Sequence, residues 1–171
     1  MPTGVELACP RREQAVVTLR PYRAEDAAAL LELFRDTVRQ VNSADYSLVQ
    51  IRAWASDEIT LADWSKRFEG RLSYVAEIDS LPVGFTDMTS HGHIDRFFVS
   101  SKYQRCGVGR VLLTRLIHDA QQLELQSVTA DVSITARPFF EAHQFRVLMQ
   151  QTVQSRGVDF TNFRMERTIA E

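Results

Sequence analysis

One stretch, residues 93–123, most constrains what this chain can fold into. Residues 93–99 are apolar for the most part, and their length and their aromatic and β-branched content predict a strand. A polar segment with two glycines, Gly107 and Gly109, follows. Over residues 109–123 the apolar side chains recur at the spacing of one helix face. The stretch is therefore predicted to be a strand, a glycine-containing turn and a helix.

A turn of this kind is suited to bind an anion. The first N–H groups of a helix have no partner inside the helix and lie at the positive end of its dipole. Gly107 and Gly109 carry no side chain, so a bulky anion can approach the backbone. The turn is not a P-loop, because no Lys-Ser or Lys-Thr follows Gly109. It also lacks the third glycine, and the place near the first strand, of a dinucleotide-binding fingerprint.

The pattern Q-R-x-G-x-G over residues 104–109, after a strand ending in F-F-V, resembles the acyl-CoA signature of the GCN5-related N-acetyltransferases (GNAT). The resemblance implies that acetyl-CoA is the co-substrate and that loop amides hold its pyrophosphate. It also implies that the pantetheine arm lies along the end of the central strand, with an oxyanion contact from the N–H of Phe98 or Val99. The implied acetyl-CoA-binding residues are Phe98, Val99, Gln104, Arg105, Cys106, Gly107, Val108, Gly109, Arg110, Ser133 and Phe140.

Length and composition are those of one globular domain, which we place at residues 15–171 after a disordered leader at 1–14. The 22 acidic and 20 basic residues nearly cancel without a basic cluster, which argues against a nucleic-acid-binding surface. Cys9 and Cys106 stand in no metal-ligand spacing, and we expect no metal. Without a signal peptide or a membrane-length apolar run, we expect a cytoplasmic protein that does not enter the membrane.

The rest of the chain alternates strands and helices. A strand ending at Pro21 precedes a helix that reaches about Val41, and two short helices and a hairpin at 72–88 follow. After the central helix we expect a strand at 127–132, a short helix capped by Thr135, and final strands at 144–149 and 160–166. The predicted fold is a three-layer α/β/α GNAT domain with a mixed, twisted sheet of about seven strands.

Two residues of the central strand are candidates for the general base. Alternation puts His93, Asp95, Phe97 and Val99 on one strand face. His93 and Asp95 match positions at which several members of the family, including the arylalkylamine acetyltransferases, keep a Glu or His that relays the amine proton. Either side chain could accept a proton directly or through water. Each residue also has a purely structural explanation. Asp95 could form an ion pair with a neighbouring arginine, and His93 could be a solvated residue at the start of the strand.

The chain departs from the family in the helix near Phe140. Family members carry N-x-x-A-x-x-x-Y there, and the Tyr protonates the departing thiolate. The alignment puts Ser133 at the Asn position and Phe140, which cannot donate a proton, at the Tyr position. Other tyrosines that could replace it are Tyr103, Tyr74 and Tyr46. A thiolate with a pKa around 8.5 can also leave without an acid.

The expected function is transfer of an acetyl group from acetyl-CoA to a primary amine, on a small molecule or a protein. The alternative is a non-catalytic acetyl-CoA sensor or partner domain, which Phe140 favours. In the family, the segment between the first helices lines the acceptor pocket. Candidate pocket aromatics are therefore Tyr46, Trp54 and Trp64, although both tryptophans also fit core positions. The sequence identifies neither the acceptor nor the oligomeric state, for which a homodimer is one candidate.

Overall fold

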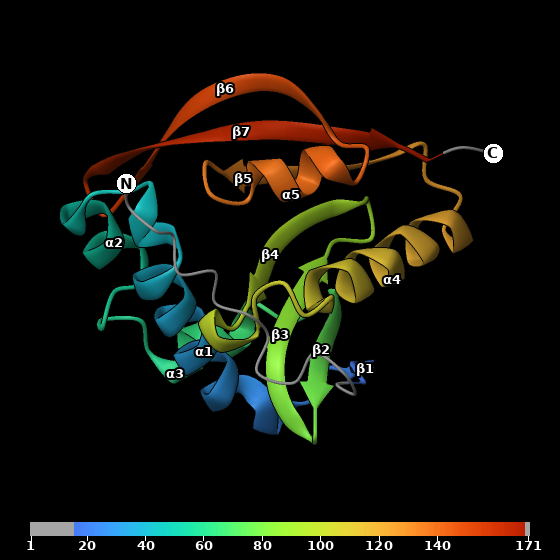
Figure 1. Ribbon diagram of the computed structural model, residues 1–171, viewed down its shortest axis with the longest axis horizontal. Helices are drawn as coiled ribbons and strands as arrows, with labels where there is room; N and C mark the ends of the chain where they lie inside the picture. Colours follow the sequence, from blue (N-terminus) through green and yellow to red (C-terminus); the bar gives the residue numbers. More distant parts are fainter. Residues whose placement is uncertain (1–15, 170–171) are drawn as a thin grey trace, which may run out of the picture.

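The computed structural model describes residues 16–169, and the predicted leader, residues 1–14, lies outside them (Figure 1). Seven strands form one sheet in the order β1-β2-β3-β4-β5-β7-β6. Among the described residues, β4 and β5 run parallel and the other neighbours are antiparallel. The predicted mixed sheet is confirmed. The strands are β1 (Thr18–Pro21), β2 (Leu72–Ile78), β3 (Leu81–Met88), β4 (His93–Val99), β5 (Ser127–Ser133), β6 (Arg146–Ser155) and β7 (Val158–Thr168).

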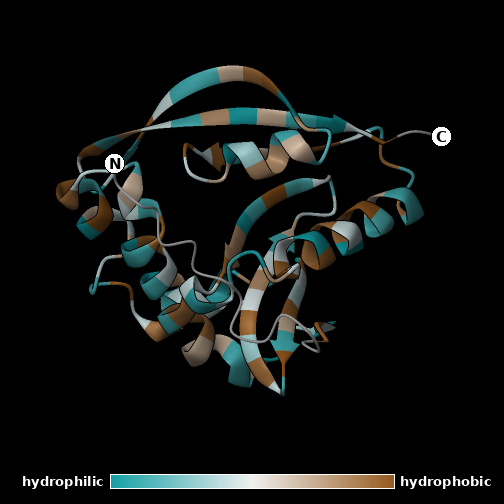
Figure 2. Cartoon of the chain, viewed as in Figure 1, coloured by the Kyte–Doolittle hydropathy of each residue, from teal (hydrophilic) through white to brown (hydrophobic). Residues whose placement is uncertain are grey.

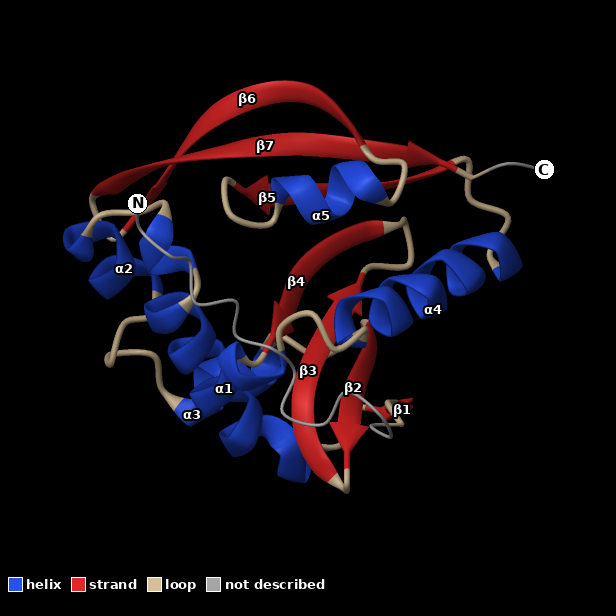
Figure 3. Cartoon of the chain, in the orientation of Figure 1, coloured by secondary structure: helices blue, strands red, loops and turns tan. Residues whose placement is uncertain are grey.

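Helices cover both faces of the sheet, as Figure 3 shows. One face packs against α1 (Ala27–Gln40), α2 (Leu48–Trp54) and α3 (Leu61–Lys66). The other packs against α4 (Val108–Gln122) and α5 (Arg137–Ala142). Each face has its own apolar cluster, to which residues of the helices on that face contribute. Figure 2 shows hydrophobic and hydrophilic residues interspersed along these helices. Short 3₁₀ turns are η1 (Ala24–Asp26), η2 (Asn42–Ala44) and η3 (Ser101–Tyr103).

Local sequence explains where α2 begins, whereas the start of α5 differs from the prediction. Ser47 caps α2, with its hydroxyl accepting from the Gln50 N–H while the Gln50 side chain accepts from the Ser47 N–H. The predicted Thr135 cap of α5 is wrong, because the N-cap is Ala136. The Ala136 N–H instead donates to the Ser133 hydroxyl, 3.0 Å away.

The last two strands are longer than predicted. They join through a two-residue turn in which Arg156 (φ 47°) and Gly157 (φ 73°) are both left-handed, as a tight hairpin requires. Most side chains of β6 are exposed, so polar residues occupy both of its faces. Its sequence therefore lacks the alternation that reveals a strand half-buried against a core.

No described helix is both long and apolar enough to cross a membrane.

Candidate active site

The site is a split in the sheet between two parallel strands. β4 and β5 pair at His93–Thr129 and Ile94–Ala130, and beyond these positions they diverge (Figure 1). A cavity of about 1020 Å³ occupies the split. It extends from the loop before α4 to the aromatic side chains beside α2. These are the two ends of one continuous cavity.

The loop before α4 forms the first end of this cavity. Arg105 (φ 64°) and Gly107 (φ 82°) are left-handed, and Gly107 is the N-cap of α4. The Gln104 side chain donates to the Val99 carbonyl at 2.7 Å and folds the loop back onto the end of β4. The Val111 N–H donates to the Gly107 carbonyl, so the three N–H groups before it are the unpaired donors of a helix start.

The two glycines of the loop are required for different reasons. A Cβ at Gly107 would meet open space, so its need for glycine comes from its positive φ. A Cβ at Gly109 would lie 3.1 Å from two ring atoms of Phe139, which is tighter than ordinary contact. Gly109 therefore permits the close approach of α4 and α5 on this wall of the cavity.

Nearly all of the predicted acetyl-CoA residues lie on the cavity wall. Cys106 is the exception, since its side chain packs against the apolar cluster around α4. Ser133 and Phe140, at the end of β5 and in α5, also line the wall. Those on the wall are Phe98, Val99, Gln104, Arg105, Gly107, Val108, Gly109, Arg110, Ser133 and Phe140.

The register of β3 and β4 separates the two candidate oxyanion donors. The Ser100 N–H donates to the Val83 carbonyl at 2.8 Å, and Gly84 pairs with Val99 in the next position. Hydrogen-bonded and non-hydrogen-bonded pairs alternate in antiparallel strands, so the Val99 N–H is directed away from β3 and into the split. The Phe98 N–H is directed toward β3.

A β-bulge interrupts β4 at Asp95. Asp87 lies opposite Arg96, but the next residue of β3, Met88, lies opposite Ile94. Asp95 is thus the additional residue of β4. The Arg96 N–H donates to the Asp87 carboxylate at 3.1 Å, so a side chain satisfies the backbone donor that the bulge displaces.

The bulge overturns the predicted strand face. Ile94 packs in the cluster on the α4 side together with Phe97 and Val99. It lies three and five positions before them, which in a regular strand would put it on the opposite face. The face predicted to carry His93, Asp95, Phe97 and Val99 is therefore not continuous.

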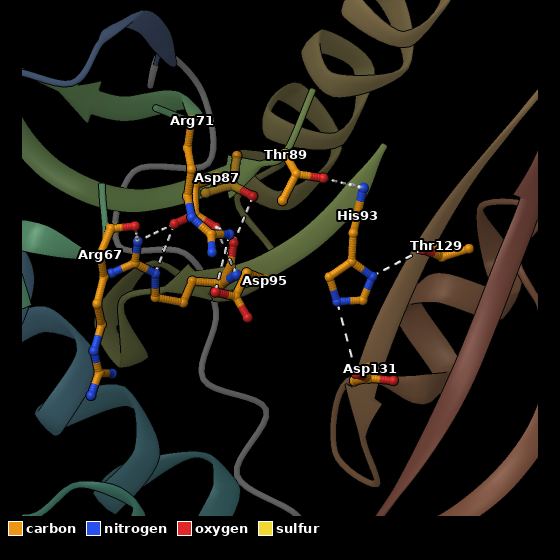
Figure 4. Close-up of polar contacts among 10 residues, drawn as sticks. Arg67, Arg71, Asp87, Thr89, His93, Asp95, Thr129 and Asp131 are labelled. Atoms are coloured by element: carbon orange, nitrogen blue, oxygen red, sulfur yellow. Dashed lines mark hydrogen bonds and ion pairs between the residues drawn. The ribbon is translucent and has the colours of Figure 1, made fainter. Parts of the chain in front are cut away.

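The two candidate bases lie in separate polar networks, as Figure 4 shows. Asp95 lines the cavity, is about half exposed, and lies 3.2 Å from Arg71 Nη1 in an ion pair without hydrogen-bond geometry. The His93 ring lies off the cavity wall. Its Nδ1 is 2.9 Å from Thr129 Oγ1 and its Nε2 is 3.8 Å from Asp131.

A buried ion pair between Asp87 of β3 and Arg96 of β4 stabilises the bulge. Asp87 is fully buried and hydrogen-bonds with the Arg96 guanidinium, which also donates to the Arg67 carbonyl at 2.7 Å. Burial raises the pKa of the Asp87 carboxyl, and Arg96 opposes the rise. Arg96 also stacks over the Phe68 ring, 4.0 Å from its centroid, which ties the turn after α3 to β4.

Aromatic side chains form the second end of the cavity. Tyr46 and Trp54 line it, and their rings meet edge to face at 5.5 Å. Phe160 of β7 lies 6.2 Å from Trp54. Trp64, the third predicted pocket aromatic, is fully buried among Phe34, Phe68 and Phe85 and does not line the cavity.

The three tyrosines that could replace the family acid have different surroundings. The Tyr46 hydroxyl donates to the Thr161 carbonyl, and burial raises its pKa. The Tyr74 hydroxyl donates to Asp119 at 2.5 Å beside α4, away from the cavity wall. Tyr103 lines the cavity near the loop.

Several residues on the cavity wall carried no signal that identified them in the sequence. The Thr37 hydroxyl donates to the Val99 carbonyl at 3.1 Å, and the Asn42 amide donates to the Ser133 hydroxyl at 3.4 Å. Thr37 lies in α1 and Asn42 in η2, and both elements are remote in sequence from the strands that these side chains contact. Asp131 could have been found, because it is a polar residue of the predicted strand at 127–132. Phe160 and Asn162 also line the wall.

The described residues contain no group of three or more His, Cys, Asp or Glu side chains that could hold a metal ion.

Comparisons with known proteins agree on one family. The model of the acetyltransferase (GNAT) domain matches residues 42–167. The chain is 39% identical over 149 residues to the uncharacterized N-acetyltransferase YafP of Escherichia coli K12, covering 87% of this chain and 94% of YafP. A GCN5-related N-acetyltransferase structure from Rhodopseudomonas palustris superposes with a TM-score of 0.87 at 30% identity, covering 92% of this chain and 99% of that one.

A more distant structure shows the same fold. The PaiA N-acetyltransferase from Thermoplasma acidophilum, solved in complex with coenzyme A, has a TM-score of 0.73 at 19% identity, over 90% of this chain and 99% of that one. The matched family model spans most of the described chain, and residues 93–123 form the strand, glycine-containing turn and helix that the sequence predicted. The chain belongs to the GNAT family of acetyl-CoA-dependent N-acetyltransferases.

Proposed function

We propose that the enzyme transfers the acetyl group of acetyl-CoA directly to a primary amine that enters the cavity from the aromatic end. The observation that carries the proposal is the single cavity that joins the loop before α4 to the aromatic side chains beside α2. Two reactants entering from opposite ends would meet in the split between β4 and β5. Holding them together is itself a large part of catalysis.

The loop supports acetyl-CoA binding at the first end. The left-handed Arg105 and Gly107 turn successive N–H groups of the loop toward one side, an arrangement that favours an anion. The open space at Gly107 leaves room for a phosphate group beside the backbone. Arg105 and Arg110 line the same end and add positive charge.

Acetyl-CoA supplies an activated thioester, and the amine nitrogen bonds to its carbonyl carbon as the carbon–sulfur bond breaks. The Val99 N–H, which is directed into the split, is suited to donate to the carbonyl oxygen as that oxygen gains negative charge. Asp95 lines the cavity, and its ion pair with Arg71 lacks hydrogen-bond geometry, so its carboxylate oxygens can accept the amine proton. His93 is the weaker candidate, because its ring is bound to Thr129 and lies off the wall.

A second function, an acetyl-CoA sensor without catalysis, is favoured by Phe140. This residue is 2% exposed and packs against Phe97, Phe139 and Phe145, so no proton donor stands at the family Tyr position. The two functions make the same prediction for acetyl-CoA binding and opposite predictions for turnover.

The deciding experiment combines binding and turnover. Calorimetry should show saturable acetyl-CoA binding, and ATP and NAD should not shift the melting temperature. Release of the free CoA thiol should then be followed over a panel of primary amines and lysine peptides. Tight binding without amine-dependent release would support the sensor, whereas no binding would overturn both functions. A cytoplasmic location and a homodimeric state are further proposals, to be tested by cell fractionation and light scattering.

A further inference from the structure

The ionisable side chains on the cavity wall are unevenly neutralised. Asp95 is paired with Arg71 at 3.2 Å, and Asp131 is paired with Arg164 at 2.5 Å. Each carboxylate on this wall is therefore offset by an arginine from a neighbouring strand or loop. The buried Arg96 is in turn paired with Asp87.

Two further arginines on the cavity wall are not offset in this way. Arg67, the C-cap of α3, makes no side-chain hydrogen bond or ion pair with a described residue, and its guanidinium lies 5.7 Å from the Trp64 ring centroid. Arg156, in the β6–β7 turn, uses one of its N–H groups to donate to the Ala53 carbonyl at 3.2 Å and has no ion-pair partner among the described residues. Both residues line the cavity.

Contacts with neighbouring elements hold the Arg67 backbone and the Arg156 side chain in place. The Arg67 carbonyl accepts a hydrogen bond from Arg96 of β4, and the contact of Arg156 with Ala53 holds it next to Trp54. An arginine has five N–H donors in a planar fork that matches a carboxylate. Most of these donors remain available on both residues. The phosphates of CoA do not account for them, since Arg105 and Arg110 lie at the opposite, loop end of the cavity.

Beside the arginines the wall is apolar and aromatic. Trp54, Tyr46 and Phe160 form a connected set of rings, with centroids 5.5–6.2 Å apart. An acceptor that fits this wall has an apolar or aromatic body, and the uncompensated positive charge disfavours a second ammonium group.

We infer that the acceptor is a primary amine with an apolar body and a carboxylate remote from the amine, and that Arg67 and Arg156 bind the carboxylate. This inference rests on the proposed function, because it concerns the acceptor of the same transfer. The arginines would select among amines and would not take part in the chemical step.

The test compares three amines that share one aromatic body. These are para-(aminomethyl)benzoate, the neutral para-(aminomethyl)benzamide and para-xylylenediamine, which carries a second ammonium group. We expect kcat/KM for the benzoate to exceed that for the benzamide at least about tenfold, because hydrogen bonds between charged partners outweigh neutral ones. The diamine should be the poorest substrate.

Variants connect the preference to the two residues. Arg67→Gln and Arg156→Gln should each lower the benzoate-to-benzamide ratio, and the double variant should bring it close to one. Arg52→Gln is the matched control, since Arg52 is an exposed arginine of α2 off the cavity wall and its loss changes the net charge equally. Thermal melts should show that all variants fold.

Three results would overturn the inference: a diamine that is the best substrate, a ratio near one in the wild type, or a ratio that survives in the double variant. If none of the amines releases CoA, the proposed transfer fails for them, and calorimetry then decides the inference separately. Tighter binding of the benzoate than of the benzamide to the CoA-loaded protein would support it, and equal binding would overturn it.

Discussion

The hydroxyl of Tyr46 donates a hydrogen bond to the carbonyl oxygen of Thr161, 2.7 Å away and 115 residues later in the chain. The hydroxyl oxygen of Tyr46 in turn accepts a hydrogen bond from the Ile134 N–H at 3.0 Å. Tyr46 therefore links the corner before α2 to β7 and to the turn after β5, on the far side of the split. The Tyr46 hydroxyl proton is already donated to the Thr161 carbonyl, so Tyr46 connects the two sides of the cavity structurally. It is a poor candidate for the acid that would protonate the departing thiolate.

Tyr46→Phe should lower stability more than activity. The change leaves the Thr161 carbonyl and the Ile134 N–H without their partner in a partly buried place, which typically costs about 1–3 kcal/mol. Urea denaturation measures this loss. The pH dependence of kcat should keep its wild-type shape, and loss of a limb of that profile would instead identify Tyr46 as a catalytic acid.

Gly107→Ala should weaken acetyl-CoA binding out of proportion to its effect on folding. A non-glycine residue at φ 82° costs about 1–2 kcal/mol of stability. The added methyl group also enters the open space beside the loop, and we expect the Kd for acetyl-CoA to rise at least about tenfold. Gly70→Ala is the control, because Gly70 also has a positive φ and open surroundings but lies off the cavity. Equal acetyl-CoA affinity in the two variants would locate the cofactor elsewhere.

Gly109→Asp tests the second glycine of the loop. The new side chain would press on the Phe139 ring and place a negative charge where the pyrophosphate is proposed to bind. We expect calorimetry to detect no acetyl-CoA binding. Wild-type affinity in a variant that melts cooperatively would contradict the proposed loop site.

Asp95→Asn should lower the rate roughly 10²–10⁴-fold at neutral pH, the usual contribution of a positioned proton transfer. Acetyl-CoA affinity should hardly change, because Asp95 lies away from the loop. The deficit should shrink at high pH, where the acceptor amine is already neutral. His93→Gln should have the smaller effect, since the ring lies off the cavity wall. Wild-type rates for both variants from pH 6 to 9 would mean that neither residue is the base.

Asp26→Asn should destabilise the fold in a pH-dependent way. Arg20 forms two hydrogen bonds with the Asp26 carboxylate, at 2.7 and 2.8 Å, and lowers its pKa. The pKa of Asp26 is lower in the folded state than in the unfolded state. This stabilisation is therefore fully present above the ordinary Asp pKa, and it is lost as the pH falls from there through the lowered pKa of the folded state. We expect a deficit of about 1.5–3 kcal/mol at pH 7 that narrows below about pH 5. Urea denaturation of Glu69→Gln, an exposed acid, provides the comparison; a deficit independent of pH would show that charge is not the cause.

The sequence by itself determined the local elements and the cofactor loop. Residues 72–78, 81–88 and 93–99 form the strands predicted for them, since each packs at least one face against a core. The spacing of Gln104, Gly107 and Gly109 between a strand and a helix predicted the family. These are short-range properties, set by side-chain period, backbone freedom and helix ends.

The tertiary structure alone decided how the candidate site is arranged. The bulge at Asp95 separates it from His93, and it depends on the buried Asp87 and Arg96, whose pairing across strands has no local signal. Trp64 is directed into the core because α3 packs on β3 and β4, not because its own sequence differs from that of Trp54. Arg67 and Arg156 reach one cavity from elements 89 residues apart only once the helices dock and the last hairpin crosses the split. Contacts between residues so distant in sequence depend on packing of the whole chain, which periodicity within a segment does not encode.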